Sequence, residues 1–240
     1  MLLDTGKIDG KVVIAKDAIL KTRIPQSIIS NGGHAFNKQH FDLYALGWEM
    51  YEYEGRQFIG HTGGVNGFVT SVTLFPEERL GIIVLTNTDS NAFFEALRNE
   101  IQDAFLKLPY RNYSSVYHKW TKGREQRDEM RIKQLRDTIA MKPKTDLPLY
   151  AFAGTYKHDL YGNMTMTLKG DKLVATFEHH KGRYADVEAL GKNRFLATFN
   201  EALYGTKVWP FKIDGGTVKS VTVTVADFVE FTPYEFFKVN

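Results

Sequence analysis

From residue 147 onward, hydrophobic and polar residues alternate with a period of two. Apolar residues stand at every second position on both sides of the turn segment 169–172, namely Met164, Met166, Leu168, Leu173, Ala175 and Phe177. Similar runs follow at 193–199, 206–213, 217–225 and 228–238. Successive side chains of a strand point to opposite faces, so this rhythm predicts about seven or eight antiparallel strands. In so short a segment they predict a small all-β barrel or sandwich over residues 147–240.

Residues 1–107 combine strand and helix patterns. Phe68–Leu74 and Leu80–Leu85 are rich in β-branched and aromatic residues and flank a polar turn, which predicts a hairpin. A second hairpin is predicted from the run 44–53, followed by Glu54-Gly55 and then by 56–61. These strands predict an antiparallel sheet.

A helix is predicted after the second hairpin. The polar cluster Thr88-Asp89-Ser90-Asn91 is typical of a helix N-terminus. Apolar residues then recur at helical spacing, at Phe94, Leu97, Ile101, Phe105 and Leu108. We expect this stripe to pack on the sheet. Together with the strands it predicts an α+β fold, with the sheet and its helix in residues 1–107.

The segment 108–146 has the character of a basic, partly helical connector. Residues 107–146 carry eleven Lys and Arg against five Asp and Glu, whereas the whole chain has a net charge of +3. Ile132, Leu135 and Ile139 have helical spacing, and prolines 143 and 148 end any helix. Acidic residues interleave the basic ones in 122–129, which indicates a solvated helix face. We therefore expect no nucleic-acid partner.

Composition excludes several kinds of site. The chain has no cysteine, which excludes disulfides, thiolate metal sites and a cysteine nucleophile. No apolar run approaches the roughly 18 to 20 residues of a membrane span, and Met1–Asp4 lacks the features of a signal peptide. His179 and His180 are adjacent and would point to opposite faces of a strand, so no metal is predicted. No cofactor is predicted either.

The segment 60–68 carries the strongest chemical signal. It has glycine at 60, 63, 64 and 67 and lies between two strand patterns. Phosphate loops and dinucleotide fingerprints need a helix directly after the glycines, so neither fits. Glycine in a strand lets another backbone approach closely, and His61 and Thr62 place hydrogen-bonding side chains beside that approach.

His61-Thr62-Gly63 resembles the third motif, Lys or His, then Thr or Ser, then Gly, of the serine β-lactamase, penicillin-binding protein and related esterase superfamily. The segments Leu2–Lys11, Tyr44–Trp48, Gly67-Phe68 and Leu80–Asn87 resemble its class C branch, in the same order. The resemblance covers roughly residues 1–107. Residues 147–240 resemble the lipocalin-like β-domain that often follows such members.

The resemblance implies a role for each residue of the motif. His61 would supply a cation or hydrogen-bond donor near the nucleophile, and Thr62 would supply a hydroxyl. Gly63 would keep this wall of the site low, and Gly64 would give a backbone N–H to the oxyanion hole. The substrate, a small molecule or a peptide, would lie along the strand edge as an added strand.

The chain departs from the family pattern in one important way. It holds no Ser-x-x-Lys nucleophile motif. Tyr110-Arg111-Asn112 and Tyr161-Gly162-Asn163 match the second motif, Tyr-x-Asn, by letter, but both follow the third motif instead of preceding it. We therefore expect a fragment of a serine acyl-transfer hydrolase of β-lactamase, D-alanyl-D-alanine peptidase or esterase type, inactive alone. The resemblance implies a periplasmic or otherwise extracytoplasmic residence.

Two further expectations follow. If strands are missing, Ile82–Thr86 should have an unpaired edge, which favours self-association or capture of a partner. As an alternative function, the chain would be a non-catalytic binding module whose C-terminal barrel takes a small ligand or partner. The barrel's aromatic residues are expected to fill its interior: Tyr156, Phe177, Tyr184, Phe195, Phe199, Trp209 and Phe211.

Overall fold

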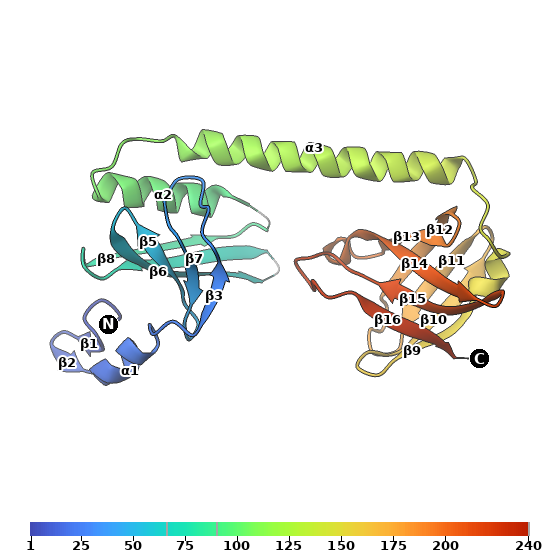
Figure 1. Ribbon diagram of the computed structural model, residues 1–240, viewed down its shortest axis with the longest axis horizontal. Coiled ribbons are helices and arrows are strands. Elements are labelled where there is room, and N and C mark those ends of the chain that lie inside the picture. The colour runs from blue at the N-terminus through green and yellow to red at the C-terminus, as the bar shows by residue number, and fades with distance from the viewer. Residues whose placement is uncertain (66, 90, 240) are drawn as a thin grey trace. The chain divides into compact units, whose positions relative to one another are not determined.

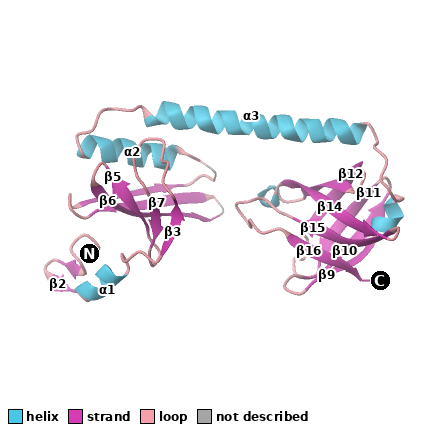
Figure 2. Cartoon of the chain, in the orientation of Figure 1, coloured by secondary structure: helices cyan, strands magenta, loops and turns pink. Residues whose placement is uncertain are grey.

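The computed structural model describes residues 1–65, 67–89 and 91–239 (Figure 1). Two residues of the predicted segments therefore lie outside the described part, Asn66 of the glycine-rich segment and Ser90 of the cap cluster. The chain divides into two compact units, Met1–Arg124 and Glu125–Asn240. Helices and antiparallel sheets together confirm the α+β class (Figure 2).

The first unit is built on a six-stranded antiparallel sheet with its strands in sequence order. The strands are β3 (Ser27–Ser30), β4 (Asp42–Tyr44), β5 (Glu49–Tyr53), β6 (Arg56–Val65), β7 (Phe68–Phe75) and β8 (Leu80–Thr86). A small hairpin of β1 (Lys7–Ile8) and β2 (Lys11–Val12) and the short helix α1 (Lys16–Lys21) precede the sheet. The two predicted hairpins, β5–β6 and β7–β8, are confirmed.

The predicted single run 44–53 is wrong, because it contains a turn. β4 ends at Tyr44 and β5 begins at Glu49, and Gly47 between them has φ +82°. Only glycine adopts such a φ readily, so this residue allows the chain to reverse. At the next turn, Glu54 and Gly55 both have positive φ, the combination that matches the twist of a two-residue hairpin.

Helix α2 (Phe93–Phe105) packs on one face of the sheet. The Oδ1 atom of Asn91 accepts hydrogen bonds from the backbone N–H groups of Phe93 and Phe94, which confirms a polar cap at this end. The apolar cluster between helix and sheet comprises Tyr53, Phe58, Phe75, Leu80, Ile82, Val84, Phe94 and Leu106.

The predicted apolar stripe of α2 is only partly correct. Phe94 is buried, but Ile101 is 40% exposed and Phe105 is 53% exposed. The buried face is instead largely polar and includes Arg98, Asn99, Gln102 and Asp103. Asp103 accepts hydrogen bonds from the hydroxyls of Tyr53 at 2.5 Å and Tyr113 at 2.7 Å. Burial and the bond to Asp103 both raise the pKa of Tyr53.

The opposite face of the sheet is only partly covered. Ala45, Met50, Ile59 and Leu74 form a small buried cluster there, with Leu2 and Leu3 packed against it. On β8, Ile83 and Leu85 alternate with buried neighbours and are 68% and 73% exposed. Among the described strands β8 has a neighbour only on the β7 side, so Ile82–Thr86 lies at a sheet edge.

The second unit contains a closed eight-stranded antiparallel barrel. Its strands are β9 (Gly154–His158), β10 (Gly162–Lys169), β11 (Lys172–Phe177), β12 (Tyr184–Gly191), β13 (Arg194–Phe199), β14 (Thr206–Asp214), β15 (Thr217–Val223) and β16 (Tyr234–Val239). The short 3-10 helices η1 (Leu149–Phe152) and η2 (Ala202–Tyr204) also belong to this unit. The predicted strand count is confirmed.

Two details of the barrel differ from expectation. The last strand begins at Tyr234 and not at residue 228, because Pro233 has no backbone N–H to give to a ladder. Tyr184 is 42% exposed and does not fill the interior, whereas Tyr156, Phe195 and Trp209 are fully buried.

The basic segment forms the long helix α3 (Tyr113–Ala140). Residues 122–129 are exposed apart from the half-buried Gly123, which fits a solvated face. The division between the two compact units falls within this helix, at Arg124. The assignment of 108–146 as a separate connector stays a prediction. In the described part of the chain, no helix is both long and apolar enough to cross a membrane.

Candidate functional site

The motif His61-Thr62-Gly63-Gly64 lies at the end of β6, where this strand extends beyond its neighbour. β5 pairs with β6 as far as Glu49 opposite Gly60 and then ends. β7 continues to pair with β6 from Ile59 to Val65. Residues 61–65 therefore have a strand on one side only, within the described structure. Their outward backbone N–H and C=O groups form a short open edge.

His61 is half-buried and held on both ring nitrogens. Its Nε2 lies 3.0 Å from the hydroxyl of Tyr44, and its Nδ1 lies against the carbonyl oxygen of Thr62. A carbonyl oxygen only accepts, so Nδ1 carries the proton in the neutral ring and Nε2 accepts from Tyr44. The two rings meet edge to face, with centroids 5.9 Å apart. Tyr44 therefore positions the imidazole.

Tyr44 was not predicted as a site residue. It lies at the end of β4, two strands from β6, and the turn at Gly47 brings it level with the extension of β6. Gly47 is the sequence signal for this position, because a turn there splits the run 44–53 into two strands and leaves Tyr44 at a strand end.

The glycines of the segment differ in what they accommodate. A Cβ on Gly60 would lie 2.6 Å from the ring of Phe58 and 3.0 Å from the carbonyl oxygen of Val72. A Cβ on Gly63 would meet only the hydroxyl of Thr70, at 3.5 Å. Gly60 is thus required by packing within the sheet, whereas the space beside Gly63 is free.

The other two motif residues complete the strand end. Thr62 is exposed and pairs with Ser71, whose buried hydroxyl has no partner among the described residues. Gly64 pairs with Val69. The four predicted site residues are therefore consecutive on one open strand end.

The two Tyr-x-Asn matches have structural positions. The Oδ1 atom of Asn112 accepts a hydrogen bond from the backbone N–H of Ser115 at the start of α3. Asn163 pairs with Lys157 inside the barrel ladder. Neither match provides a polar partner for the motif strand in the described structure.

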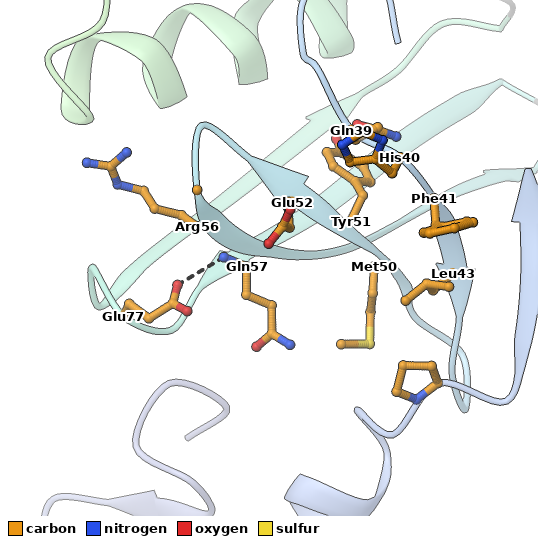
Figure 3. Close-up of a pocket in the computed structure, with 12 residues that line it drawn as sticks. Gln39, His40, Phe41, Leu43, Met50, Tyr51, Glu52, Arg56, Gln57 and Glu77 are labelled. Carbon is orange, nitrogen blue, oxygen red and sulfur yellow. Dashed lines mark hydrogen bonds between the residues drawn. The ribbon is translucent and has the colours of Figure 1, made fainter. Parts of the chain in front are cut away.

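A surface pocket of about 400 Å³ lies elsewhere on the first unit (Figure 3). It is bordered by the β4–β5–β6 region and the turn after β7, and its lining includes His40, Met50, Tyr51, Gln57 and Glu77. In Figure 3 the carboxylate of Glu77 accepts a hydrogen bond from the backbone N–H of Gln57. The motif residues 61–64 do not line this pocket, so the pocket gives no evidence that the motif binds a ligand.

Metal ligands do not gather in the described part of the chain. No group of three or more His, Cys, Asp or Glu side chains there could hold a metal ion. His179 and His180 are both exposed.

Each of the two units contains a segment that matches a known protein family. Residues 20–106 match the family described as Beta-lactamase, and residues 140–238 match the family described as Domain of unknown function (DUF3471). The first match includes the complete motif and Tyr44.

Two fungal proteins are similar in sequence. The unguisins hydrolase ungD of Aspergillus violaceofuscus is 30% identical over 142 residues, which is 55% of this chain and 25% of that protein. The unguisins hydrolase ungD' of Aspergillus campestris is 28% identical over 131 residues, 51% of this chain and 24% of that protein. The matched part of this chain spans about a quarter of these relatives.

Among solved structures, the octameric penicillin-binding protein homologue from Pyrococcus abyssi has a TM-score of 0.37 at 14% identity, over 99% of this chain and 44% of that chain. SurE has a TM-score of 0.30 at 15% identity, over 95% of this chain and 43% of that chain.

Proposed function

Since residues 20–106 form part of a β-lactamase-like serine hydrolase domain, we propose that His61–Val65 is one wall of an acyl-transfer site. The observation that carries this proposal is the open edge of β6 beyond Gly60. An extended small-molecule or peptide substrate pairs with that edge as an added strand. The free space beside Gly63 lets its backbone approach.

Each motif residue has a role in this wall. His61 places its imidazole beside an anionic group of the substrate, and Tyr44, hydrogen-bonded to Nε2, keeps the ring in place. Thr62 offers its exposed hydroxyl, and Gly64 gives a backbone N–H to the oxyanion. A donor of this kind typically stabilises the transition state by about 2.7 to 4 kcal/mol.

The nucleophile belongs to another part of the parent protein in this proposal. The sequence contains no Ser-x-x-Lys, so the chain by itself forms no acyl-enzyme. We expect a fluorescent penicillin to leave the 27.4 kDa chain unlabelled. A stoichiometric covalent adduct would show that a nucleophile is present after all.

The wall itself is tested by non-covalent binding. In an NMR titration with N-acetyl-D-alanyl-D-alanine, we expect amide shifts centred on residues 61–65. Gly63→Val should abolish them, because the branched side chain occupies the approach path. Gly81→Val is the matched control, since Gly81 is also an exposed strand glycine but lies on β8. Equal loss in both variants, or shifts centred on the barrel, would contradict the proposal.

The finer family assignments are also proposals. The class C branch and the lipocalin-like nature of the barrel are supported by the sequence resemblance alone. We propose extracytoplasmic residence on the same ground, and recovery of the protein in the cytosolic fraction of source cells would contradict it. The two similar curated hydrolases are fungal, so a bacterial periplasm stays a prediction.

A further inference from the structure

The two ends of the barrel are built differently. At one end the strands are joined by tight turns at 170–171, 192–193 and 215–216. At the other end the connections are longer, at 178–183, 200–205 and 224–233. We call this second end, with its three long connections, the barrel mouth. Longer loops at one end of a rigid barrel are where binding sites are usually found.

The interior of the barrel is already filled. Tyr156, Phe195 and Trp209 are fully buried, and Phe152 of η1 is buried against Phe195 and Phe211, with ring centroids 4.8 and 5.1 Å apart. The buried Phe199, Val223 and Phe236 belong to the same core and form the floor of the mouth.

An apolar cavity of about 190 Å³ lies at the mouth. It is lined by residues from four strands, the three long connections and the short β9–β10 connection: Tyr161, Phe177, His180, Arg183, Phe199, Tyr204, Val223, Val225, Val229, Glu230, Thr232, Tyr234 and Phe236. Close-packed interiors contain few voids larger than a water molecule. A comparable apolar cavity of about 150 Å³ in another protein holds benzene. This cavity therefore has the size of a single ring system.

Two groups of aromatic rings border the cavity. In the first, Phe199 stacks on Phe177 at 5.7 Å and contacts Tyr204 at 5.4 Å. In the second, Tyr161 contacts Tyr234 at 4.7 Å and lies parallel to Phe236 at 6.5 Å. Since each group is held by its own ring contacts, a planar ring in the cavity could contact both at the separations that aromatic pairs prefer.

The charged groups at the mouth have partners within the protein. Arg183 forms an ion pair with Glu201 at 2.5 Å. The carboxylate of Glu230 accepts hydrogen bonds from the hydroxyl of Tyr234 at 3.1 Å and from the backbone N–H of Thr232 at 2.9 Å. Because these charges are neutralised or hydrogen-bonded locally, the cavity presents mainly carbon to a ligand.

We propose that the barrel mouth binds a small molecule through one neutral, planar aromatic ring of benzene to indole size. The ring enters between the two aromatic groups, and the polar part of the molecule stays at the rim beside His180 and Glu230. This site lies in the second unit, in the segment that matches a domain of unknown function. It is independent of the proposed acyl-transfer wall.

The test is an NMR titration of the full 240-residue chain with indole. We expect saturable shifts at amides of the mouth connections, with a dissociation constant on the order of 1 mM for so small a ligand. Residues 61–65 should not respond, which separates this site from the acyl-transfer wall. N-acetyl-tryptophan amide tests whether a ring carried on a peptide enters equally well, and binding of either ring compound at the mouth supports the proposal.

Two matched variants locate the site. Val229 lines the cavity and is 40% exposed, whereas Val239 is 39% exposed and lies at the other end of β16. Val229→Trp should fill the cavity and weaken indole binding at least about tenfold. Val239→Trp should leave binding unchanged. Because both side chains are partly exposed, both variants should keep the barrel folded, which the dispersion of the same spectra checks.

Three outcomes would overturn the proposal. The first is the absence of any saturable response to indole and N-acetyl-tryptophan amide at the mouth. The second is equal binding of cyclohexanol, which has similar bulk but no planar ring. The third is a response to tetramethylammonium alone, which would identify a cation site.

Discussion

The barrel and the six-stranded sheet solve the problem of strand edges in opposite ways. Every barrel strand has two neighbours because the barrel is closed. The sheet ends at β3 and β8, and the end of β6 has a strand on one side only. A closed barrel offers its loops and cavities to ligands, whereas an open sheet also offers its backbone. The two proposed sites follow this difference.

The largest effect should come from the core of the barrel. Trp209 is fully buried and donates a hydrogen bond from Nε1 to the carbonyl oxygen of Thr224 at 2.9 Å. We expect Trp209→Ala to lower the free energy of unfolding of the barrel by about 3 to 5 kcal/mol in urea denaturation. Tyr184→Ala should cost only about 1 kcal/mol, because Tyr184 on β12 of the same barrel is 42% exposed. Similar losses in both variants would mean that the barrel is not held by its filled interior.

The first unit should depend instead on a buried polar network. Asp103 is 3% exposed and accepts hydrogen bonds from Tyr53 and Tyr113. Asp103→Ala leaves both hydroxyls without this acceptor, and we expect a loss of about 3 kcal/mol in unfolding free energy. Asp4→Ala, which removes an exposed ion pair with Arg79 in the same unit, should change stability by less than about 1 kcal/mol. A small effect at Asp103 would indicate that the sheet, like the barrel, relies on apolar packing.

Substitutions at the two β6 glycines Gly60 and Gly63 should distinguish a packing role from a functional one. Gly60→Ala places a Cβ against Phe58 and the backbone of Val72, so we expect a loss of about 1 to 3 kcal/mol in thermal or urea unfolding. Gly63→Ala meets only the hydroxyl of Thr70 and should cost less than about 0.5 kcal/mol. If Gly63→Ala lowered the unfolding free energy more than Gly60→Ala, Gly63 would be required for packing. The space beside Gly63 would then give no support to a substrate site.

The smallest expected effect concerns the edge strand β8. We expect the chain to self-associate through this edge at high micromolar concentration in sedimentation equilibrium. Leu85→Lys should weaken the association about tenfold, or about 1.4 kcal/mol, because charged side chains discourage edge pairing. Phe237→Lys is the control, since Phe237 is 58% exposed on β16 and pairs with a strand on each side. A wild-type chain that stays monomeric would show that the open edge of the sheet does not mediate association.

Local patterns in the sequence determined most of the elements. The alternation around residues 164–177 predicted barrel strands, and the run 68–85 predicted the β7–β8 hairpin, because both depend on the period of a strand and on turn residues. The interleaved charges of 122–129 predicted a solvated helix face, because charged side chains of both signs favour contact with water. His61, Thr62, Gly63 and Gly64 are likewise recognisable as a motif from their order along the chain.

Only the tertiary structure decided how these elements meet. Helical spacing favoured Ile101 and Phe105 as buried residues, yet the polar side of α2 faces inward, where Asp103 accepts hydrogen bonds from Tyr53 and Tyr113. Strand register placed Tyr44 beside His61 and ended β5 opposite Gly60. Such contacts join residues distant in sequence, and the local pattern of apolar and polar positions carries no information about which strand ends first. The sequence therefore identified the motif, and the pairing of the strands decided that its edge is open.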